Sequence, residues 1–277
     1  MKIAVYTRED SSLTDGRFMR MSDKLVSSGF KLYRIRSSSD LAEDTSLVLS
    51  VGGDGTFLSA SKRVGQSGIP VLGINMGRLG FLSEYSPEEA CEAILAGTYT
   101  LEDRALLETR VDGKMLDSDS SFWPYTLNEI SVLRCGASIL GIDVAIDGNP
   151  LPTYWADGLL VSTSSGSTAY SLSVGGPICV PDSKVLIIAP IAPHNLNVRP
   201  LVVPDTTKIR ISMRSRDEKV TMSMDNRNLV LSSDAVIDVK VAQFSLKRVR
   251  LEKSSFIKAL TTKLFWGEDI RNGGEQV

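Results

Sequence analysis

The sequence predicts an α/β domain followed by an all-β domain, with a final helix that packs back on the first domain. Over the first hundred residues, short apolar runs alternate with helical patterns, which is typical of an open α/β sheet. After about Leu101, apolar and polar residues alternate in several closely spaced runs, as half-buried strands require. We expect the first domain to cover residues 1–103, completed by 254–277, and the second to cover 104–253.

Three apolar runs and two helical patterns support the first domain. Strands are expected at 3–6, 47–51 and 70–74, and a helix at about 13–28. The run at 47–51 is mostly apolar and leads into a glycine turn, which indicates a buried parallel strand. A second helix should begin at Pro87, with Ser86 as its N-cap, acids in its first turn and Gly97 at its end.

Alternation with a period of two supports the second domain. Strands are expected around 142–146, 209–212, 220–224 and 239–241. Asp147 and Gly148 follow the first of these runs and form a dipeptide that favours a hairpin turn. The last pattern, at 256–265, has the spacing of a helix, and Gly267 should lie at its end.

The composition is that of an ordinary globular protein. Apolar residues make up 42% of the chain and charged residues 23%, which is enough to build a core. The net charge is -2, and no segment gathers Lys and Arg on the scale of a nucleic-acid footprint. The basic run at 247–250 alternates within an expected strand, so we interpret it as a solvated strand face. No apolar run approaches the roughly 18 residues of a membrane-spanning helix.

The cysteines and the N-terminus favour a reducing compartment. Cys91, Cys135 and Cys179 are scattered, odd in number and without C-x-x-C spacing, so they predict neither a disulfide framework nor a metal site. The chain turns polar within a few residues of Met1, too soon for a signal peptide. We therefore expect the protein in the cytoplasm.

A glycine turn with a central acid is the first candidate site. Gly52, Gly53, Asp54, Gly55 and Thr56 follow the buried strand and precede a helical pattern. Glycines let a phosphate approach the backbone, and amides at a helix N-terminus attract that anion. An acid repels phosphate, so Asp54 suits a base for an attacking hydroxyl or a holder of the metal that accompanies ATP. An ordinary Gly-Asp-Gly turn is the alternative; neither a P-loop nor a dinucleotide fingerprint occurs.

A hydroxyl-rich loop is the second candidate. The segment 157–163 resembles a strand that leads into the loop 164–173, and Gly175, Gly176 and Pro177 follow. Such a loop can offer small donors to ribose and base edges, and Tyr170 offers a surface on which a heterocycle can stack. A serine-rich surface loop is the alternative, but it would not need two glycines and a proline after an aromatic residue.

Two shorter features are weak by themselves. Asn128 and Glu129 form an adjacent amide and acid, for which a solvated pair is the default interpretation. His194 is the only histidine and lies next to Pro193, so it cannot form a metal cluster or a Ser/His/Asp triad, and a structural role is at least as plausible as a catalytic one.

Taken together, these segments resemble the NAD kinase family, in that family's order. The matching segments are 52–56, 75–84, Asn128 with Glu129, 157–177 and 194–204. They span about residues 47 to 227. The glycine-aspartate turn is shared with diacylglycerol-type lipid kinases and phosphofructokinases. The segment from Thr168 to Tyr170 with Gly175, Gly176 and Pro177 is more specific.

The resemblance implies a Rossmann-like first domain, a C-terminal β-sandwich, and transfer of the γ-phosphoryl group of ATP to NAD. It implies that Asp54 is the catalytic residue and accepts or orients the 2′-hydroxyl proton of the adenosine ribose. Gly52, Gly53, Gly55 and Thr56 would form the phosphate loop. The NAD-binding residues would be Asp54, Gly55, Asn128, Glu129, Asp157, Thr168, Ala169, Tyr170, Ser171, Leu172, Ser173 and Arg227.

The resemblance further implies a divalent metal, Mg2+ with ATP, as cofactor, although no metal ligands are assigned. It implies a homodimer or homotetramer in which a neighbouring subunit can contribute to the dinucleotide site. No nucleic-acid or membrane partner is expected.

Two positions depart from the family pattern. Ser164 stands where the family usually has proline, which leaves the loop less rigid. Arg227 follows Asp225 and Asn226 where the family commonly shows an Asp-Gly-Gln-like turn. Arg227 could contact the dinucleotide through its guanidinium, or it could extend into solvent.

Two other functions remain open at the level of sequence. A lipid kinase would share the glycine-aspartate turn, but it needs an apolar acceptor cleft, whereas the segment 163–173 is rich in hydroxyls. A non-catalytic NAD(P)-binding sensor would gain nothing from the carboxylate of Asp54 beside phosphates. A coupled assay with ATP, magnesium and NAD separates the three functions.

Overall fold

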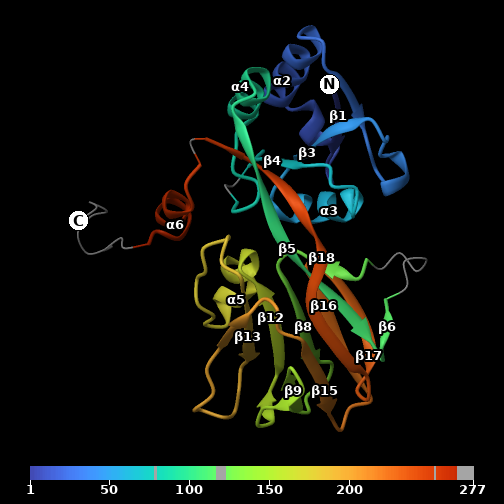
Figure 1. The fold of residues 1–277 in the computed structure, drawn as a ribbon, viewed down its shortest axis with the longest axis vertical. Coiled ribbons are helices and arrows are strands. Elements are labelled where there is room, and N and C mark those ends of the chain that lie inside the picture. Colours follow the sequence, from blue (N-terminus) through green and yellow to red (C-terminus); the bar gives the residue numbers. More distant parts are fainter. Residues whose placement is uncertain (78–79, 117–122, 253, 267–277) are drawn as a thin grey trace. The chain divides into compact units, whose positions relative to one another are not determined.

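The chain divides into two compact units. The computed structural model describes residues 1–77, 80–116, 123–252 and 254–266 (Figure 1). The first unit comprises Met1–Asp103 and Leu246–Val277, and the second comprises Arg104–Ser245. The chain returns to the first unit at Leu246, where the sequence-based prediction placed this return at 254. The reason is that the long strand β18 (Val236–Leu251) begins in the second unit and ends beside the sheet of the first.

The first unit is built on a parallel sheet with the order β2-β1-β3-β4. Its strands are β1 (Lys2–Tyr6), β2 (Lys31–Arg34), β3 (Thr45–Val51) and β4 (Val71–Ile74). All residues of β3 except Ser46 are buried, as its apolar run predicted. Strand β2 was not predicted, because its sequence is polar and it lies at the edge of the sheet.

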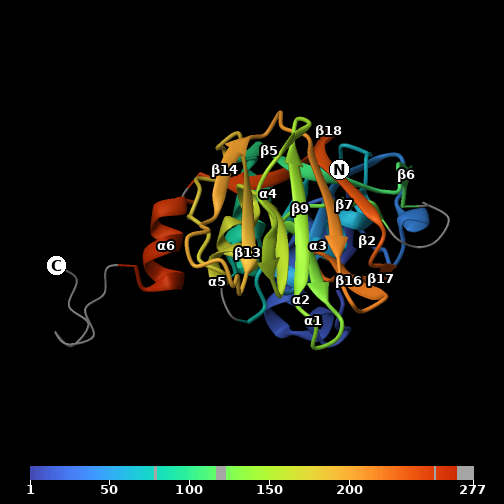
Figure 2. The same ribbon diagram turned by 90° about the horizontal axis from the view of Figure 1, so that it is seen from below.

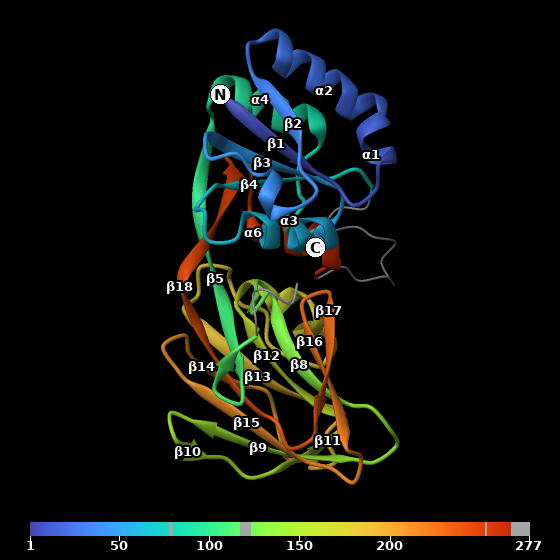
Figure 3. The ribbon, with the colours of Figure 1, turned by 90° about the vertical axis from the view of Figure 1, so that its right-hand side faces the viewer.

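Helices lie on both faces of this sheet. The helices of this unit are α1 (Ser11–Thr14), α2 (Gly16–Ser27), α3 (Asp54–Val64), α4 (Pro87–Ala96), α6 (Phe256–Leu264), which lies beside the sheet (Figure 1), and the short 3-10 helix η1 (Ser38–Asp40). Helices α2 and α4 lie on one face and α3 on the other (Figure 3). Apolar residues of α2 and α4, such as Phe18, Leu25 and Ile94, complete a core with the strands. Among the described residues, no helix combines the length and apolar character of a membrane span.

The ends of these helices follow their capping residues. The helix predicted at 13–28 is divided at Asp15, whose carboxylate accepts the amide of Arg17 and starts α2 there. Helix α4 confirms its prediction, since Ser86 and Glu89 form a capping box and Gly97 ends it at a φ of 67°. Helix α6 ends at Leu264, and Gly267, the predicted end, lies outside the described residues.

The second unit is a sandwich of antiparallel sheets, and the predicted fold class is thus confirmed (Figure 2). One sheet has the order β14-β13-β12-β8-β16-β17, and the other contains β10-β9-β15-β18 with β5, β6, β7 and β11. The strands of the first sheet are β8 (Glu129–Arg134), β12 (Gly158–Thr163), β13 (Val185–Ile191), β14 (Leu201–Pro204), β16 (Lys219–Met224) and β17 (Arg227–Ser232). The others are β5 (Tyr99–Val111), β6 (Lys114–Met115), β7 (Tyr125–Thr126), β9 (Leu140–Ile146), β10 (Asn149–Pro150), β11 (Tyr154–Ala156) and β15 (Ile209–Arg214).

The core of the second unit lies between its two sheets. Ile142 and Val144 of β9 belong to the same apolar cluster as Val161 of β12 and Ile188 of β13. The alternating pattern placed these side chains on the inner faces, as a period of two requires. The predicted hairpin is confirmed: Asp147 and Gly148 connect β9 and β10, both at positive φ.

At Gly73, strand β4 packs closely against the backbone of residues 82 and 83. A Cβ at Gly73 would lie 2.4 Å from the carbonyl oxygen of Leu82. We therefore expect Gly73→Ala to lower the free energy of unfolding by about 2 kcal/mol or more, because backbone cannot move aside cheaply. The matched control is Gly16→Ala, where the nearest atom is the flexible tip of Arg20 at 3.4 Å, and no loss is expected. Urea unfolding measures both; equal stability of the two variants would contradict the prediction.

Candidate functional site

The carboxyl edge of the parallel sheet carries the first group of candidate residues. Strands β1, β3 and β4 are parallel, so their carboxyl ends meet at one edge, where open α/β sheets bind ligands. Asp54 follows β3 directly, and Asn75 follows β4. Arg8, which the sequence reasoning missed, follows β1 at the same edge. Its position after the first parallel strand was a signal that could have found it.

The predicted phosphate loop forms a tight turn into helix α3. Gly52 has a φ of 149°, and a Cβ there would lie 2.5 Å from the hydroxyl of Thr56, so glycine is required. Gly53 is the N-cap of α3, and Asp54 is its first residue. The amides and dipole at this helix N-terminus favour an anion. At Gly55, a Cβ would lie 3.2 Å from the Nη1 atom of Arg8, so a cation reaches this turn.

Backbone amides hold the carboxylate of Asp54. Oδ2 accepts the amide of Phe81 at 2.8 Å, and Oδ1 accepts those of Leu82 and Ser83, each at 2.9 Å. A Cβ at Gly80 would lie 2.0 Å from Oδ1, so only glycine allows this approach. Asp54 is half-buried at the head of α3. The segment 80–83 therefore fixes the orientation of the candidate base.

Strand β18 adds a buried arginine behind this segment. The guanidinium of Arg248 donates to the carbonyl of Phe81 at 3.2 Å, and it pairs with Glu84 at 3.2 Å and Glu102 at 3.7 Å. The interpretation of 247–250 as a solvated strand face is wrong for Arg248, which is only 5% exposed. Two acids that lie far away in sequence compensate its charge, which local alternation could not reveal.

In the second unit, candidate residues gather where β8 begins and β12 and β16 end. Glu129 pairs with Ser162, and Ile130 pairs with Met224, so these strand ends are adjacent. Just beyond β16, Asp225 adopts a φ of 51°. Its carboxylate accepts the amides of residues 127, 128 and 129 at 3.0, 2.9 and 3.4 Å. Asp225, which sequence reasoning treated only as a turn residue, thus holds the Asn128–Glu129 turn.

Two buried acids therefore share this turn. Burial, and then the charge of Asp225, raise the pKa of Glu129 to about 8, while the amide of Tyr170 opposes the rise. Burial also raises the pKa of Asp225, but three amides and Arg227 oppose that rise. Because Asp225 has more partners for its charge, Glu129 holds the proton of the pair near neutral pH.

Several buried oxygens of this region lack partners. Among the described residues, Asn128 Oδ1, Glu129 Oε2 and Ser171 Oγ are buried and accept or donate no hydrogen bond. A buried polar atom without a partner is unfavourable by about 1–3 kcal/mol, so such atoms are rare unless a ligand or water meets them. Asn128 and Glu129 lie together where β8 begins, and their free oxygens fit a ligand with hydroxyl and amine groups.

Some hydroxyls of the hydroxyl-rich loop form hydrogen bonds with the backbone and so stabilise the conformation of the loop. Thr163 Oγ1 donates to the carbonyl of Leu127 at 2.6 Å, and Ser164 Oγ donates to that of Pro181 at 2.8 Å. Ser167 Oγ accepts the amide of Cys179 at 3.0 Å. The loop forms the 3-10 helix η3 (Ser165–Thr168) and the short helix α5 (Tyr170–Ser173). Of the predicted ligand residues in this loop, those left partly or fully exposed are Thr168, Ala169, Tyr170, Leu172 and Ser173.

The structure separates Asp157 from the other predicted ligand residues of this unit. Asp157 precedes β12, whereas Thr163 ends it, so six residues of strand, roughly 20 Å, lie between the two ends. The carboxylate of Asp157 pairs with Arg134 at 2.7 Å. Within this chain, Asp157 does not meet Asn128.

Arg227 does not extend into solvent. Its guanidinium donates to the carbonyls of Trp123 at 2.5 Å, Tyr125 at 2.6 Å and Met224 at 3.2 Å. The side chain is only 16% exposed. Arg227 thus fixes the backbone that leads into the Asn128–Glu129 turn, a long-range role that the turn sequence alone could not predict.

The fold and these sites define a two-domain nucleotide-binding protein with an acid at the head of its anion-binding helix. The ATP-NAD kinase N-terminal domain family matches residues 12–99, and the ATP-NAD kinase C-terminal domain family matches 127–251. The chain therefore belongs to the NAD kinase family.

Relatives and solved structures agree with this assignment. The chain is 46% identical over 232 residues to the NAD kinase of Bacteroides fragilis strain ATCC 25285, covering 82% of this chain and 79% of that protein. It is 42% identical over 244 residues to the NAD kinase of Flavobacterium psychrophilum, covering 86% and 82%. An NAD kinase from Archaeoglobus fulgidus in complex with ATP superposes with a TM-score of 0.76 at 28% identity, over 91% of this chain and 95% of that one. Yeast NADH kinase complexed with NADH shares the fold, with a TM-score of 0.85 at 22% identity, over 97% and 88%.

The buried pair makes stability depend on pH. The pKa of Glu129 is about 8 in the folded chain against an ordinary value of 4.5, so between these values the folded state binds the extra proton. Stability should therefore fall as the pH rises from about 4.5 to about 8, by more than about 1 kcal/mol. Glu129→Gln removes the titrating group and should flatten this part of the profile. Exposed Glu43→Gln is the control; an unchanged slope for Glu129→Gln, in urea unfolding at several pH values, would refute the assignment.

The contacts of Arg227 predict a structural effect. Arg227→Gln removes donors from three carbonyls, so the free energy of unfolding should fall by about 1–3 kcal/mol. The exposed Arg216→Gln serves as the control. If thermal unfolding of Arg227→Gln matches the wild type while inhibition by NADP weakens, the guanidinium contacts the dinucleotide and does not hold the backbone.

Proposed function

We propose that this chain is an ATP-dependent NAD kinase, which transfers the γ-phosphoryl group of ATP to the 2′-hydroxyl of the adenosine ribose of NAD and yields NADP and ADP. The observation that carries the proposal is Asp54, an acid fixed by three amides at the head of α3, directly after a glycine turn. Membership of the NAD kinase family supports the substrates.

The first unit supplies the groups for phosphoryl transfer. The oxygen of the 2′-hydroxyl forms a bond to the γ-phosphorus, and the bond from that phosphorus to the bridging oxygen of ADP breaks. Asp54 accepts the proton that the hydroxyl loses, as a general base. The phosphate loop of Gly52, Gly53, Gly55 and Thr56 presents backbone without obstructing side chains, and the N-terminus of α3 favours the phosphates.

A divalent metal fits the residues of this edge. Mg2+ usually binds through one or two carboxylates together with substrate phosphates and water. Asp54 can provide such a carboxylate, because among the described residues Oδ2 accepts one amide hydrogen bond, from Phe81, and retains lone pairs. Arg8 and the N-terminus of α3 offset only part of the negative charge of the ATP phosphates. The metal would offset a further part. The metal would neutralise charge that develops on the transferring group.

The second unit supplies the pocket for the dinucleotide. Asn128 Oδ1 and Glu129 Oε2 are buried polar atoms without partners among the described residues, and they suit the amine of adenine and the ribose hydroxyls, to which a protonated Glu129 can also donate. Tyr170, which is 36% exposed, offers a ring on which a base can stack. The exposed residues from Thr168 to Ser173 surround it.

The position of Asp157 bears on the oligomeric state. Asp157 lies at the far end of β12 from Asn128, so it suits the dinucleotide site of a neighbouring subunit better than that of its own. This favours a homodimer or homotetramer. A light-scattering mass equal to that of one chain would contradict this part of the proposal.

The central test is formation of NADP. With ATP, magnesium and NAD, the wild-type protein should form NADP, and Asp54→Asn should reduce kcat by about 10²-fold or more, the usual scale of general-base catalysis. Binding of NAD should change far less, because the proposed ligands of the bases and riboses lie elsewhere.

Asp23→Asn, an exposed substitution on α2, is the control for this test. Phosphorylation of a lipid or sugar without any NADP would contradict the proposed function. Near-normal turnover of Asp54→Asn would leave the function in place but reduce Asp54 to a structural turn residue.

A further inference from the structure

The segment 80–83, which holds Asp54, contacts an acid through its amides and cations through its carbonyls. Its amides at 81, 82 and 83 donate to the carboxylate of Asp54. Its carbonyls accept from cations: Lys263 Nζ donates to Gly80, and Arg248 donates to Phe81 at 3.2 Å. Peptide groups polarised in this way orient their N–H ends toward the acid and their C=O ends toward the cations.

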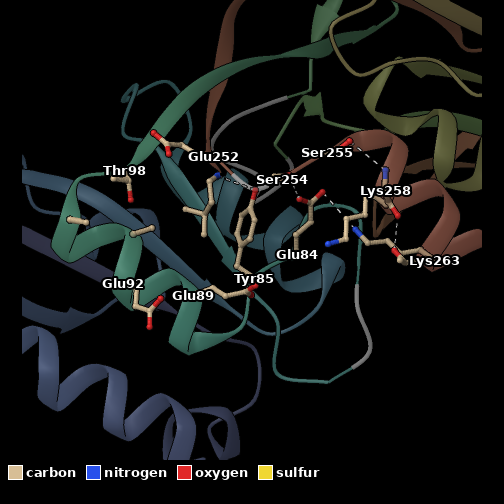
Figure 4. A pocket seen from close by; sticks show the side chains of 15 residues that line it. Glu84, Tyr85, Glu89, Glu92, Thr98, Glu252, Ser254, Ser255, Lys258 and Lys263 are labelled. Atoms are coloured by element: carbon tan, nitrogen blue, oxygen red, sulfur yellow. Dashed lines mark hydrogen bonds and ion pairs between the residues drawn. The ribbon is translucent and has the colours of Figure 1, made fainter.

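Lys263 comes to this segment from helix α6 near the end of the chain. Its ammonium lies 4.7 Å from the centroid of the Phe81 ring and 3.6 Å from Glu84 Oε1. Figure 4 shows Lys263 and Glu84 turned toward each other. Both residues line a cavity of about 550 Å³ between α4 and α6. The side chain of Lys263 is only 6% exposed. Burial lowers the pKa of Lys263, while the charges of Glu84 and Asp54 oppose the change.

Helix α6 has few other contacts that would hold it. Only Ala259 and Leu260 of this helix are buried, whereas Ile257 is 64% exposed. A cavity separates it from α4 over much of its length. An element with few buried apolar contacts opens at a low free energy, so Lys263 is one of the main anchors of the helix.

We propose that Lys263 is a positioning residue for Asp54, and that docking of α6 through Lys263 keeps the segment 80–83 in the form that orients the base. The inference rests on the proposed function, which assigns the base to Asp54. If Lys263 only stabilised the fold, an apolar side chain of similar length would serve as well at this position. Such a side chain would avoid the free-energy cost of burying a charge.

The test compares Lys263→Met with Lys258→Met on the same helix. Lys258 is exposed, and its side chain makes no hydrogen bond or ion pair among the described contacts, so it is the matched control. Lys263→Met should lower kcat by about tenfold and change KM for ATP and NAD by less than about threefold, since the lost effect acts on the base rather than on binding. Lys263→Arg should recover most of the kcat. Lys263→Gln replaces the Met variant if that variant does not fold.

A double-mutant cycle separates positioning from general stability. In an Asp54→Asn background, Lys263→Met should lower kcat by less than about twofold, because the group it positions is already disabled. The inference would be overturned if the loss of kcat in the double variant equalled the product of the losses in the two single variants. A wild-type kcat for Lys263→Met would also overturn it.

Hydrogen exchange tests the inference without any assay of activity. In the full chain, the amides of Phe81, Leu82 and Ser83 should exchange at least about tenfold faster in Lys263→Met, and at the wild-type rate in Lys258→Met. Unchanged exchange in Lys263→Met refutes the positioning role. Absence of NADP formation by the wild type, with faster exchange in Lys263→Met, refutes the proposed function and leaves the contact of α6 with this segment supported.

Discussion

A carboxylate that accepts three consecutive backbone amides is the interaction on which both candidate sites depend. In the first unit, Asp54 accepts the amides of 81–83, and in the second, Asp225 accepts those of 127–129. Successive amides can point at one acceptor only if the backbone turns sharply around it. Each acid therefore selects the conformation of a segment that is distant in the chain, and that segment orients the acid in return.

This constraint explains residues whose identities would otherwise seem incidental. Gly80 cannot carry a side chain because Asp54 occupies that space, and Gly73 cannot because the backbone of Leu82 does. Arg248 is buried beside the segment 80–83 and donates to the carbonyl of Phe81. Its charge is balanced by ion pairs with Glu84 and Glu102. In the second unit, Arg227 has the corresponding place, since it donates to carbonyls just before the held turn.

Local patterns predicted the parts of the fold that local forces determine. Strand β3, the capping box of α4 and the hairpin at Asp147 depend on residues near one another in sequence, and each was predicted. The glycine turn and Asp54 were also found, because a strand, glycines and an acid are contiguous. The partners of Asp54 lie 27 to 29 residues away, and those of Asp225 nearly a hundred, so no local pattern contains them.

The same separation explains the wrong interpretation of the run at 247–250. Alternating arginines indicate a solvated face only when no acids lie opposite, and the acids that meet Arg248 come from two other segments. Strand β2 was missed for a related reason, since an edge strand with a polar sequence carries little apolar signal.

The two amide-held acids have different surroundings, and these surroundings favour different roles. Asp225 has a side chain only 5% exposed, so no substrate hydroxyl can reach it, and its charge acts instead on Glu129, which keeps a proton to a pKa of about 8. Asp54 is half-buried at the head of α3, directly after the glycine turn. A proton acceptor must be both oriented and reachable. Asp225 does not meet the second condition, so of the two acids Asp54 remains the candidate base.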